Sequence, residues 1–489
     1  MTSIPDTSAD VSRARVPGIS PVYIMGCLES RVTIYSQQVR AIELARHLLS
    51  SGAVRASGSV AVVGAGIGGL TLSAMLAVAA PKLRVVVFER LEEVLHLQAD
   101  ARDRYVHPHI FDWPTDGAVQ ARAGLPLMEW SAGAANLVAA DLTSQFEEVR
   151  RQTRLELRTR SRVDALHSVG PDLRLSVNGA VLPDEYDSVI LCIGFGYERG
   201  ATLRNASYWS PSPLPGRFLS ETDHDLVFIS GNGDGGLADF ALAAFKGLTH
   251  EVILTRVLEH ADIAAILPLL RALDDQAWSD PSFDLLCAYR KQLSPILPKN
   301  LIREVRDMLR LKGSVIFHTN QDQLLRRETA LLNRLVAFLA IDADRRYERG
   351  RIKTVTGVPF TRVDNNSDAV ELADGQRFKP DMRLLRFGPD KESVQRPFAE
   401  EFARWRGAHG VTLGERPADP VLGESSRQWA EQAVRAAGLK VAPSPQAPEA
   451  APQQDAWPQD HRATCAGGIN VIGGNVGASA VVTQIYSDR

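Results

Sequence analysis

Residues 59–90 constrain the fold of this chain more than any other segment. They begin with a short apolar run at residues 60–63, which is typical of a buried strand. The glycine-rich sequence GAGIGG follows, then a helix of small residues over 70–80, and then a second apolar run over 85–88. This order predicts a strand, a glycine turn, a helix and a second strand, which together form the βαβ unit of an α/β fold.

Each glycine of this turn has a separate role in binding a dinucleotide. Gly64 permits the tight turn, Gly66 lets a diphosphate approach the backbone, and Gly69 lets the helix pack closely on the strand. The helix start offers unpaired N–H groups and a positive dipole end to phosphates. Glu89 lies 20 positions after Gly69, where a carboxylate can accept hydrogen bonds from ribose hydroxyls. The alternative is that the glycines serve only packing. The predicted cofactor residues are Gly64, Ala65, Gly66, Ile67, Gly68, Gly69, Glu89 and Arg90.

The composition excludes several other classes of protein. The net charge of −3 gives no reason to expect nucleic-acid binding. The four cysteines are far apart, so they form neither a disulfide framework nor a zinc spacing, and no Cys-x-x-Cys pair is present. The N-terminal residues lack the apolar core of a signal peptide, and the longest apolar runs, about a dozen residues, are too short to cross a bilayer. We therefore expect a soluble cytoplasmic protein.

A second glycine motif, GNGDGG, follows an apolar run at residues 225–230. An alanine-rich helix is predicted over 237–245, and a further strand over 251–255. The alternatives are that the motif is only a tight turn, or that it contacts the cofactor of the first site. The motif fits GxGxxG with Gly231, Gly233 and Gly236.

The end of this second unit differs in charge from the end of the first. Arg256 follows the predicted strand and lies 20 positions after Gly236, the offset that Glu89 takes in the first unit. Sites for NAD place an acid there, whereas an arginine suits the additional 2′-phosphate of NADP. The second unit is therefore predicted to bind NADPH rather than NADH.

The rest of the chain is less distinctive. Residues 1–21 are predicted to be a disordered tail, and residues 22–57 an N-terminal helical segment with helical spacing over 31–50. Residues 262–345 are predicted to be mostly helical. Residues 441–457 are rich in proline, alanine and glutamine, which predicts a flexible segment.

The order of these segments resembles that of flavoproteins with two dinucleotide-binding domains, a broad group of FAD- and NAD(P)H-dependent oxidoreductases. The first glycine motif with Glu89 looks like their FAD site, and DLVFISGNGDGG resembles the start of their nicotinamide domain. YDSVILCIGFG, which contains Gly194, resembles the strand and turn that close the first half of the FAD domain. INVIGGNVGASAVV, which contains Gly474 and Asn475, resembles the segment that brings a helix N-terminus to the flavin ring. An acid usually follows the glycine in that group, so Asn475 is a departure.

The resemblance implies an α/β fold in which a Rossmann-like FAD-binding domain carries an inserted second Rossmann-like NAD(P)-binding domain and an additional helical block. The expected boundaries are 58–220 for the first part of the FAD domain, 221–390 for the NAD(P)-binding-like domain with its helical insertion 262–345, and 391–489 for the second part of the FAD domain. The helical block and the N-terminal helix depart from the group and leave the subgroup open.

The implied activity is that of an FAD-dependent oxidoreductase. NADPH would reduce the flavin, which would pass electrons to a small organic acceptor or to oxygen, as in reductases and monooxygenases. The lack of a Cys-x-x-Cys pair argues against a disulfide reductase. Two alternatives stay open: an amine or amino-acid oxidase whose substrate reduces the flavin without NADPH, and a non-catalytic sensor that binds a dinucleotide.

Residues 101–114 hold the densest group of polar and aromatic side chains. Arg104 is a candidate for contact with the diphosphate, and His107 or His109 for acid–base chemistry near the flavin. The structural alternative is a loop that only caps the sheet. A His-x-His pair can bind a metal, but no histidine–carboxylate helix accompanies it, so no metal is expected.

Overall fold

The computed structural model describes residues 13–18, 21–27, 32–115, 117–199, 207–212, 214, 225–363, 369–409 and 420–441. The chain divides into two compact units, Met1–Pro445 and Gln446–Arg489, and all described residues belong to the first. Gly474, Asn475 and residues 442–457 lie outside the described residues. Among the described helices, none combines the length and the hydropathy that a membrane span requires.

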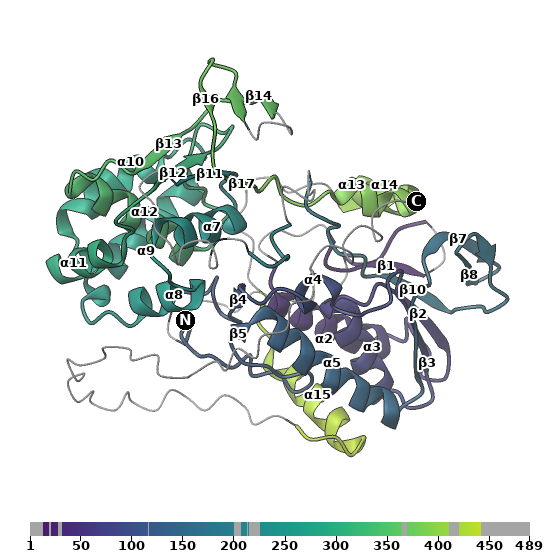
Figure 1. The fold of residues 1–489 in the computed structure, drawn as a ribbon. Helices are drawn as coiled ribbons and strands as arrows, with labels where there is room; N and C mark the ends of the chain where they lie inside the picture. The colour runs from purple at the N-terminus through teal and green to yellow at the C-terminus, as the bar shows by residue number, and fades with distance from the viewer. Residues whose placement is uncertain are drawn as a thin grey trace, which may run out of the picture. The chain divides into compact units, whose positions relative to one another are not determined.

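The first glycine motif belongs to a five-stranded parallel sheet (Figure 1). The two central valine-rich strands are buried along almost their whole length, as expected for a parallel sheet that is covered on both faces. In spatial order the strands are β1 (Val22–Ile24), β10 (Ser188–Leu191), β2 (Ser59–Val63), β3 (Arg84–Phe88) and β6 (Leu155–Arg158).

Alternate side chains of these strands face different layers, as the strand period requires. Val60 and Val62 pack with a helical layer, whereas Ala61 and Val63 pack on the opposite face. The helical layer consists of α2 (Ile34–Ser50), α3 (Ile67–Ala79), α5 (Ala135–Gln152) and α15 (Glu424–Ala436). The opposite face is covered by β7 (Val163–Val169), β8 (Asp172–Val177) and α14 (Ala399–His409), with β9 (Ala180–Val181) extending the β7–β8 hairpin.

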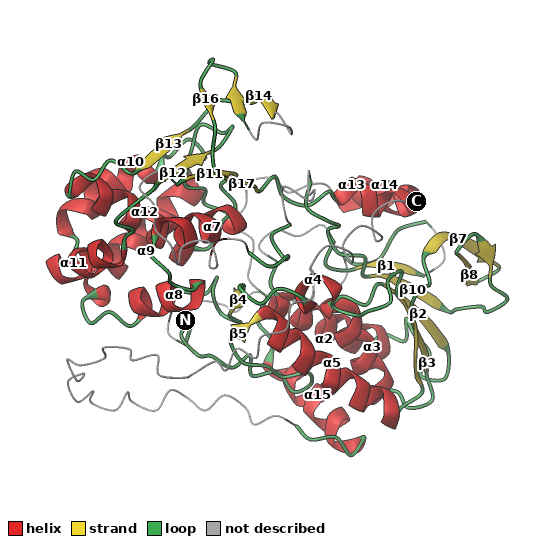
Figure 2. Ribbon diagram, in the orientation of Figure 1, coloured by secondary structure: helices red, strands yellow, loops and turns green. Residues whose placement is uncertain are grey.

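The second glycine motif belongs to a separate four-stranded parallel sheet (Figure 2). In spatial order its strands are β13 (Ile352–Val355), β12 (Ser314–His318), β11 (Leu226–Ser230) and β17 (Met382–Leu385). A small antiparallel sheet packs on one face through Val370 and Leu372, and consists of β14 (Phe360–Val363), β15 (Val370–Leu372) and β16 (Arg377–Phe378). The prediction of an α/β fold with two Rossmann-like βαβ units is confirmed.

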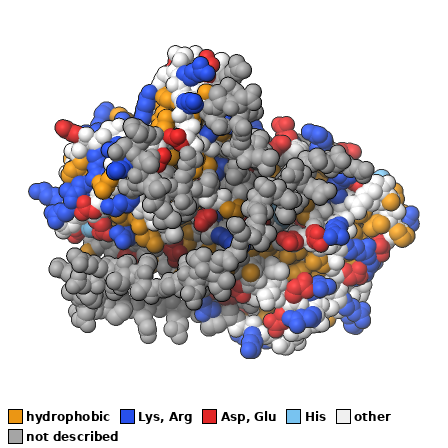
Figure 3. Space-filling view, viewed as in Figure 1, with side chains coloured by type: hydrophobic (Ala, Val, Ile, Leu, Met, Phe, Trp, Pro, Cys, Tyr) orange, Lys and Arg blue, Asp and Glu red, His pale blue; other side chains and the backbone are white. Residues whose placement is uncertain are grey.

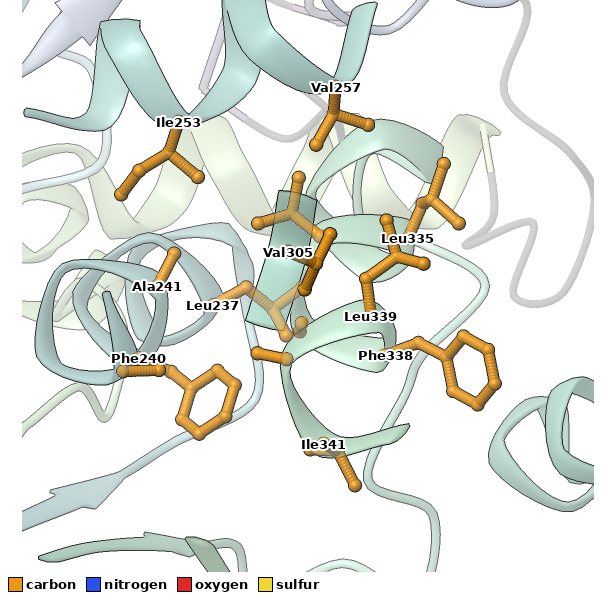
Figure 4. Packing of buried hydrophobic residues seen from close by; sticks show 14 of the residues in the cluster. Leu237, Phe240, Ala241, Ile253, Val257, Val305, Leu335, Phe338, Leu339 and Ile341 are labelled. Carbon is orange, nitrogen blue, oxygen red and sulfur yellow. The ribbon is translucent and has the colours of Figure 1, made fainter. Parts of the chain in front are cut away.

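Helices cover the other face of the second sheet. Three of these helices are α7 (Asp234–Ala244), α11 (Lys299–Met308) and α12 (Leu331–Arg346). Leu237 and Phe240 of α7 lie in one buried cluster with Val305 of α11 and Leu335 of α12 (Figure 4). The α-helices described between α7 and β12 are α8 (His250–Leu258), α9 (Leu267–Ser279), α10 (Leu285–Ala288) and α11, with short 3-10 and π segments between them. The helical insertion therefore starts earlier than residue 262, and strand β12 interrupts the predicted helical block.

The strand predicted over 251–255 is wrong, because these residues lie in helix α8. The Thr249 side chain caps this helix by accepting a hydrogen bond from the Val252 N–H. Three of its apolar residues, Ile253, Leu254 and Val257, are buried on one side, which is helical spacing. Tertiary packing therefore outweighs the strand preference of this short β-branched run.

The N-terminal region contains more than the predicted helix. The helix predicted over 31–50 is confirmed as α2, but residues 22–24 form strand β1 of the first sheet. Residues 13–18 of the predicted disordered tail are ordered: the Val16 side chain is fully buried, and its N–H donates to the Val22 carbonyl at 2.8 Å. On the face shown in Figure 3, acidic and basic side chains of the described residues are interspersed.

Candidate functional site

The first glycine turn has the shape that a diphosphate requires. Gly64 has a φ of +104°, and an added Cβ there would overlap the Cys192 carbonyl. An added Cβ at Gly69 would overlap the Gly64 carbonyl, so helix α3 and strand β2 approach too closely for a side chain. At Gly66, the N-cap of α3, an added Cβ would meet nothing within 4 Å, and no side chain caps the helix. The start of α3 is therefore open to a ligand.

The Glu89 carboxylate lies against this turn. It accepts hydrogen bonds from the Ala65 N–H at 2.8 Å and from the Leu91 N–H at 2.9 Å, one on each oxygen. Each carboxylate oxygen can accept a second hydrogen bond, so the group retains capacity for ribose hydroxyls. The neighbouring Arg90 is exposed, with its guanidinium carbon 5.2 Å from the centre of the Tyr197 ring.

The turn lies at the position where the strand order of the sheet reverses. The chain runs from β2 to β3 on one side, whereas β10 and β1 lie on the other side of β2. Ligands of open parallel sheets bind outside the carboxyl ends of the strands at such a point. Gly194 follows β10 at this edge with a φ of +68°, and an added Cβ there would meet nothing within 4 Å. The structure thus brings the first turn, Glu89 and Gly194 to one edge.

The second glycine turn repeats the backbone geometry of the first. Gly231 has a φ of +116°, an added Cβ at Gly236 would overlap the Gly231 carbonyl, and the N-cap Gly233 has open space before it. The two turns differ in charge, because the first turn of α7 contains Asp234, whereas the first turn of α3 contains no acidic residue. Its carboxylate accepts hydrogen bonds from the Ala330 N–H at 2.9 Å and from the Asn333 side chain at 2.8 Å.

Arg256 does not take the position that its spacing predicts. It lies in α8 and lines a cavity of about 480 Å³ with Lys246, Arg303 and Glu304. Because α8 is a helix and the strand beside β11 is β12, Arg256 does not end a strand of the second unit as the 2′-phosphate contact requires. That strand ends at His318, which sequence reasoning did not identify.

The His318 ring is fixed between two partners. Its Nδ1 lies 2.8 Å from the Ser230 hydroxyl, and its Nε2 lies 2.6 Å from the Val358 carbonyl oxygen. The side chain is fully buried, and this burial lowers the pKa of His318 below its ordinary value. His318 thus joins the end of β12 to the end of β11 beneath the second turn.

Arg104 lies in a buried ion cluster instead of contacting the first turn. Its guanidinium pairs with Asp239 of α7, and its Nε donates to the Tyr208 carbonyl at 2.6 Å. Arg386, which follows β17, donates to the other Asp239 oxygen at 2.6 Å. Burial alone would raise the pKa of Asp239, but the charges of Arg104 and Arg386 outweigh it and hold that pKa below its ordinary value. Arg104 therefore contacts the second glycine unit, not the expected diphosphate.

The two candidate histidines have different environments. Both ring nitrogens of His109 are occupied: Nδ1 lies 3.0 Å from an Asp112 carboxylate oxygen, and Nε2 lies 3.1 Å from the Arg122 carbonyl oxygen. His107 uses only one, because its Nδ1 accepts the His109 N–H at 3.1 Å and its Nε2 has no partner among the described residues. His109 is therefore held as a structural group, and His107 is the one with a ring nitrogen available to a ligand.

His107 is neutral near pH 7. Its pKa is lowered to about 4: burial is the largest cause, the nearby His109 adds to the shift, and Asp112 opposes it. Since Nδ1 accepts a hydrogen bond, the proton of the neutral ring lies on Nε2. His107 therefore presents a neutral N–H donor, not a base.

The loop that carries these histidines contacts both βαβ units. The Tyr35 ring of α2 lies 5.0 Å from the His109 ring, centre to centre. Tyr105 of β4 (Tyr105–Val106), which pairs with β5 (Gly133–Ala134), packs against the core of the second sheet, and Trp113 is buried within that core. Among the described residues, no cluster of three or more His, Cys, Asp or Glu side chains is arranged to hold a metal ion.

Comparison with known proteins gives matches only among solved structures. No family model and no curated protein matches the chain. The bacillithiol disulfide reductase Bdr from Staphylococcus aureus is 12% identical, with 69% of this chain and 79% of that chain covered and a TM-score of 0.37. Thioredoxin reductase from Lactococcus lactis is 10% identical over 78% of this chain and 97% of that chain, with a TM-score of 0.33. The structure of OTEMO in complex with FAD and NADP is 12% identical over 69% of this chain and 72% of that chain, with a TM-score of 0.37. These similarities are too low to assign a family.

Proposed function

We propose that this chain is an FAD-dependent oxidoreductase that uses NADPH and acts on a small organic substrate, as a reductase or a monooxygenase. The observation that carries the proposal is the open space before Gly66, beside the Glu89 carboxylate. A turn that serves packing alone needs Gly64 and Gly69, but it has no need of an uncapped helix start at Gly66 with free space in front of it.

The residues of the first site match the parts of FAD. The N–H groups at the start of α3 suit the diphosphate, the Glu89 carboxylate suits the adenosine ribose, and Gly194 lies at the same edge of the sheet. The flavin supplies hydride and oxygen chemistry when it is bound, so the protein needs to supply position and electrostatics. The neutral N–H of His107 is suited to polarise a substrate oxygen. Its lowered pKa leaves no cationic form to act as an acid near pH 7, and its Nδ1 lone pair already accepts the His109 N–H.

The second glycine turn supports a nicotinamide nucleotide as the reductant, because it repeats the open N-cap at Gly233.

One observation favours a second candidate function, an oxidase whose own substrate reduces the flavin. Asp234 places a carboxylate in the first turn of α7, where it would repel a diphosphate. Arg256 lies in helix α8, so its spacing from Gly236 does not support a 2′-phosphate contact.

The test is the absorption spectrum of the purified full-length chain, followed by anaerobic addition of NADPH. An FAD-dependent enzyme should show flavin bands at about 375 and 450 nm, and NADPH should bleach the band at the longer wavelength. A yellow protein that NADPH does not bleach but an amine or amino acid does would support the oxidase. A colourless protein that binds NAD(P) tightly would contradict both and leave a dinucleotide sensor.

Removal of the Glu89 carboxylate should weaken FAD binding. Glu89→Ala is expected to cost about 1.5–3 kcal/mol of FAD affinity, the range for a hydrogen bond to a charged group. FMN, which lacks the adenosine, is the matched probe, and its affinity should fall much less. Both affinities can be measured by fluorescence titration of the apoprotein. Equal losses for FAD and FMN would place the ribose contact elsewhere.

The neutral state of His107 should make the protein less stable in mild acid. The unfolded chain binds a proton at His107 below pH 6.5, whereas the folded chain does so only below about pH 4. The unfolded state therefore binds more protons in this window, and stability falls as the pH drops from 6.5 to 4. His107→Asn keeps an acceptor for the His109 N–H and removes the titration, so it should flatten this dependence by about 2–3 kcal/mol.

Urea unfolding of wild type and His107→Asn at several pH values checks this expectation. His250 is also buried with a pKa of about 4 and contributes equally to both proteins, so only the difference between them reports on His107. Parallel stability curves between pH 4 and 6.5 would show that His107 is not held neutral.

A further inference from the structure

The two glycine turns repeat one hydrogen-bond pattern. The Gly64 N–H donates to the carbonyl of Phe88, the last residue of β3, at 2.8 Å. The Gly231 N–H donates in the same way to the carbonyl of His318, the last residue of β12, at 2.9 Å. The first and second strands of each unit therefore end in the same register, so the two units can be compared residue by residue.

The strand on the other side of each turn also matches. An added Cβ at the first glycine of the motif would overlap the carbonyl of Cys192 after β10 in one unit, and that of Arg386 after β17 in the other. Two residues later each chain passes through a glycine with positive φ, +68° at Gly194 and +74° at Gly388, where an added Cβ would meet nothing within 4 Å. The sequence CIG after β10 therefore corresponds to RFG after β17.

The middle residue of these two segments differs in size and exposure. The first unit has a half-buried Ile193, whereas the second has Phe387, which is 43% exposed and is the one exposed phenylalanine among the described residues. The Phe387 ring lies 5.6 Å from the Phe360 ring, centre to centre, at 78° to it. A single exposed apolar side chain is ordinary by itself. This one, however, follows a strand at the edge of the sheet where ligands bind.

Phe387 lies where a dinucleotide would cross the second sheet. β12 and β17 flank β11 on opposite sides, so the strand order reverses at β11. A dinucleotide binds across such a crevice, with its diphosphate at the glycine turn and its adenosine ribose at the end of the second strand. In this unit the second strand is β12. The nicotinamide half then lies on the side of β17, the strand that Phe387 follows.

We propose that Phe387 stacks on the nicotinamide ring of the nucleotide bound at the second glycine turn. This inference rests on the proposed function, and it names the side chain that holds the reacting ring. The face of an aromatic side chain attracts another planar ring, and attracts it more strongly when that ring is cationic, as in NADP+. Contact with Phe360 already restricts the Phe387 ring, so binding costs less side-chain entropy.

The experiment titrates the FAD-loaded full-length chain by calorimetry with two ligands. NADP+ carries the nicotinamide ring but cannot reduce the flavin, and 2′-phospho-ADP-ribose lacks only that ring. Phe387→Ala should weaken NADP+ binding about 10-fold, as expected for a lost ring contact, and leave the affinity for 2′-phospho-ADP-ribose unchanged. Phe387→Tyr keeps the ring and should restore wild-type affinity for NADP+.

Tyr347→Ala is the matched control. Tyr347 is another exposed aromatic residue of the second unit, 39% exposed, and follows the last turn of α12, whereas the first turn of α12 contacts Asp234. Its removal should change neither affinity. Wild-type NADP+ affinity in Phe387→Ala would overturn the proposal, as would equal losses for both ligands, which would place the ring away from the nicotinamide. A wild-type chain that binds neither ligand would overturn the proposed use of NADPH, and this inference with it, before any variant is made.

Discussion

Replacing Gly66 with valine should abolish FAD retention while leaving the protein folded. Gly66 has a φ of −73° and a ψ of 173°, an extended conformation that valine adopts readily, and an added Cβ meets no protein atom within 4 Å. The two methyl groups would instead fill the space where the diphosphate approaches the start of α3. We expect FAD affinity to fall by at least about 100-fold, since both phosphates lose their backbone contacts.

The measurement is the flavin content of the purified variant together with FAD titration of its apoprotein. Gly233→Val is the matched control, because Gly233 has the same open N-cap geometry at the second turn. It should weaken NADPH binding and leave FAD bound. Gly69→Ala is not a useful substitution, because its Cβ would overlap the Gly64 carbonyl and disturb the fold. A Gly66→Val protein with a full complement of FAD would show that the first turn does not hold the cofactor.

The parts of the fold that follow from local chemistry could be predicted from the sequence. The strand over 59–63 contains three β-branched valines, and the GxGxxG spacing that follows favours a tight turn into a closely packed helix. The position of Glu89 beside the turn also follows from the local sequence. β2 and β3 are parallel neighbours, so their carboxyl ends lie at the same edge of the sheet. These features need no knowledge of distant residues.

The features that the sequence did not reveal depend on partners far along the chain. β1 is only 3 residues long and acquires its place by pairing with β10, more than 160 positions away. Residues 251–255 have a strand-like composition, but a capping threonine and burial against the α7 and α12 cores make them helical. Helices α8 to α11 separate α7 from β12, which is the second strand of this unit. An offset of 20 residues from Gly236 therefore could not locate the end of β12.

Arg104 illustrates the same limit for a charged side chain. Its residue type and loop position suggest a phosphate contact, but its partner Asp239 lies 135 positions later in the chain. Arg104 and Asp239 are 2% and 0% exposed, and the second arginine, Arg386, is 7% exposed. Only the packed structure reveals that this guanidinium is used to hold the loop against α7.

Substitution of Asp239 by asparagine should destabilise the protein strongly. The substitution keeps the size of the side chain but removes the negative charge that Arg104 and Arg386 share. The buried Arg104 would then lose its paired carboxylate, whereas Arg386 would lose Asp239 but keep Glu198, whose Oε2 lies 3.4 Å from its Nη1. Breaking a buried ion pair in this way costs about 3–5 kcal/mol of unfolding free energy. Urea unfolding at pH 7, followed by circular dichroism, measures the loss.

Glu156→Gln provides the matched control. Glu156 also pairs with two arginines, Arg84 and Arg158, but its side chain is 44% exposed. Solvent screens this second cluster, so its loss should cost less than about 1 kcal/mol. Equal effects of the two substitutions would show that the Asp239 cluster is solvated and does not anchor the loop of residues 101–114. If Asp239→Asn alone lowers the unfolding free energy strongly and the protein still binds FAD, the cluster anchors the loop but is not needed for cofactor binding at the first turn.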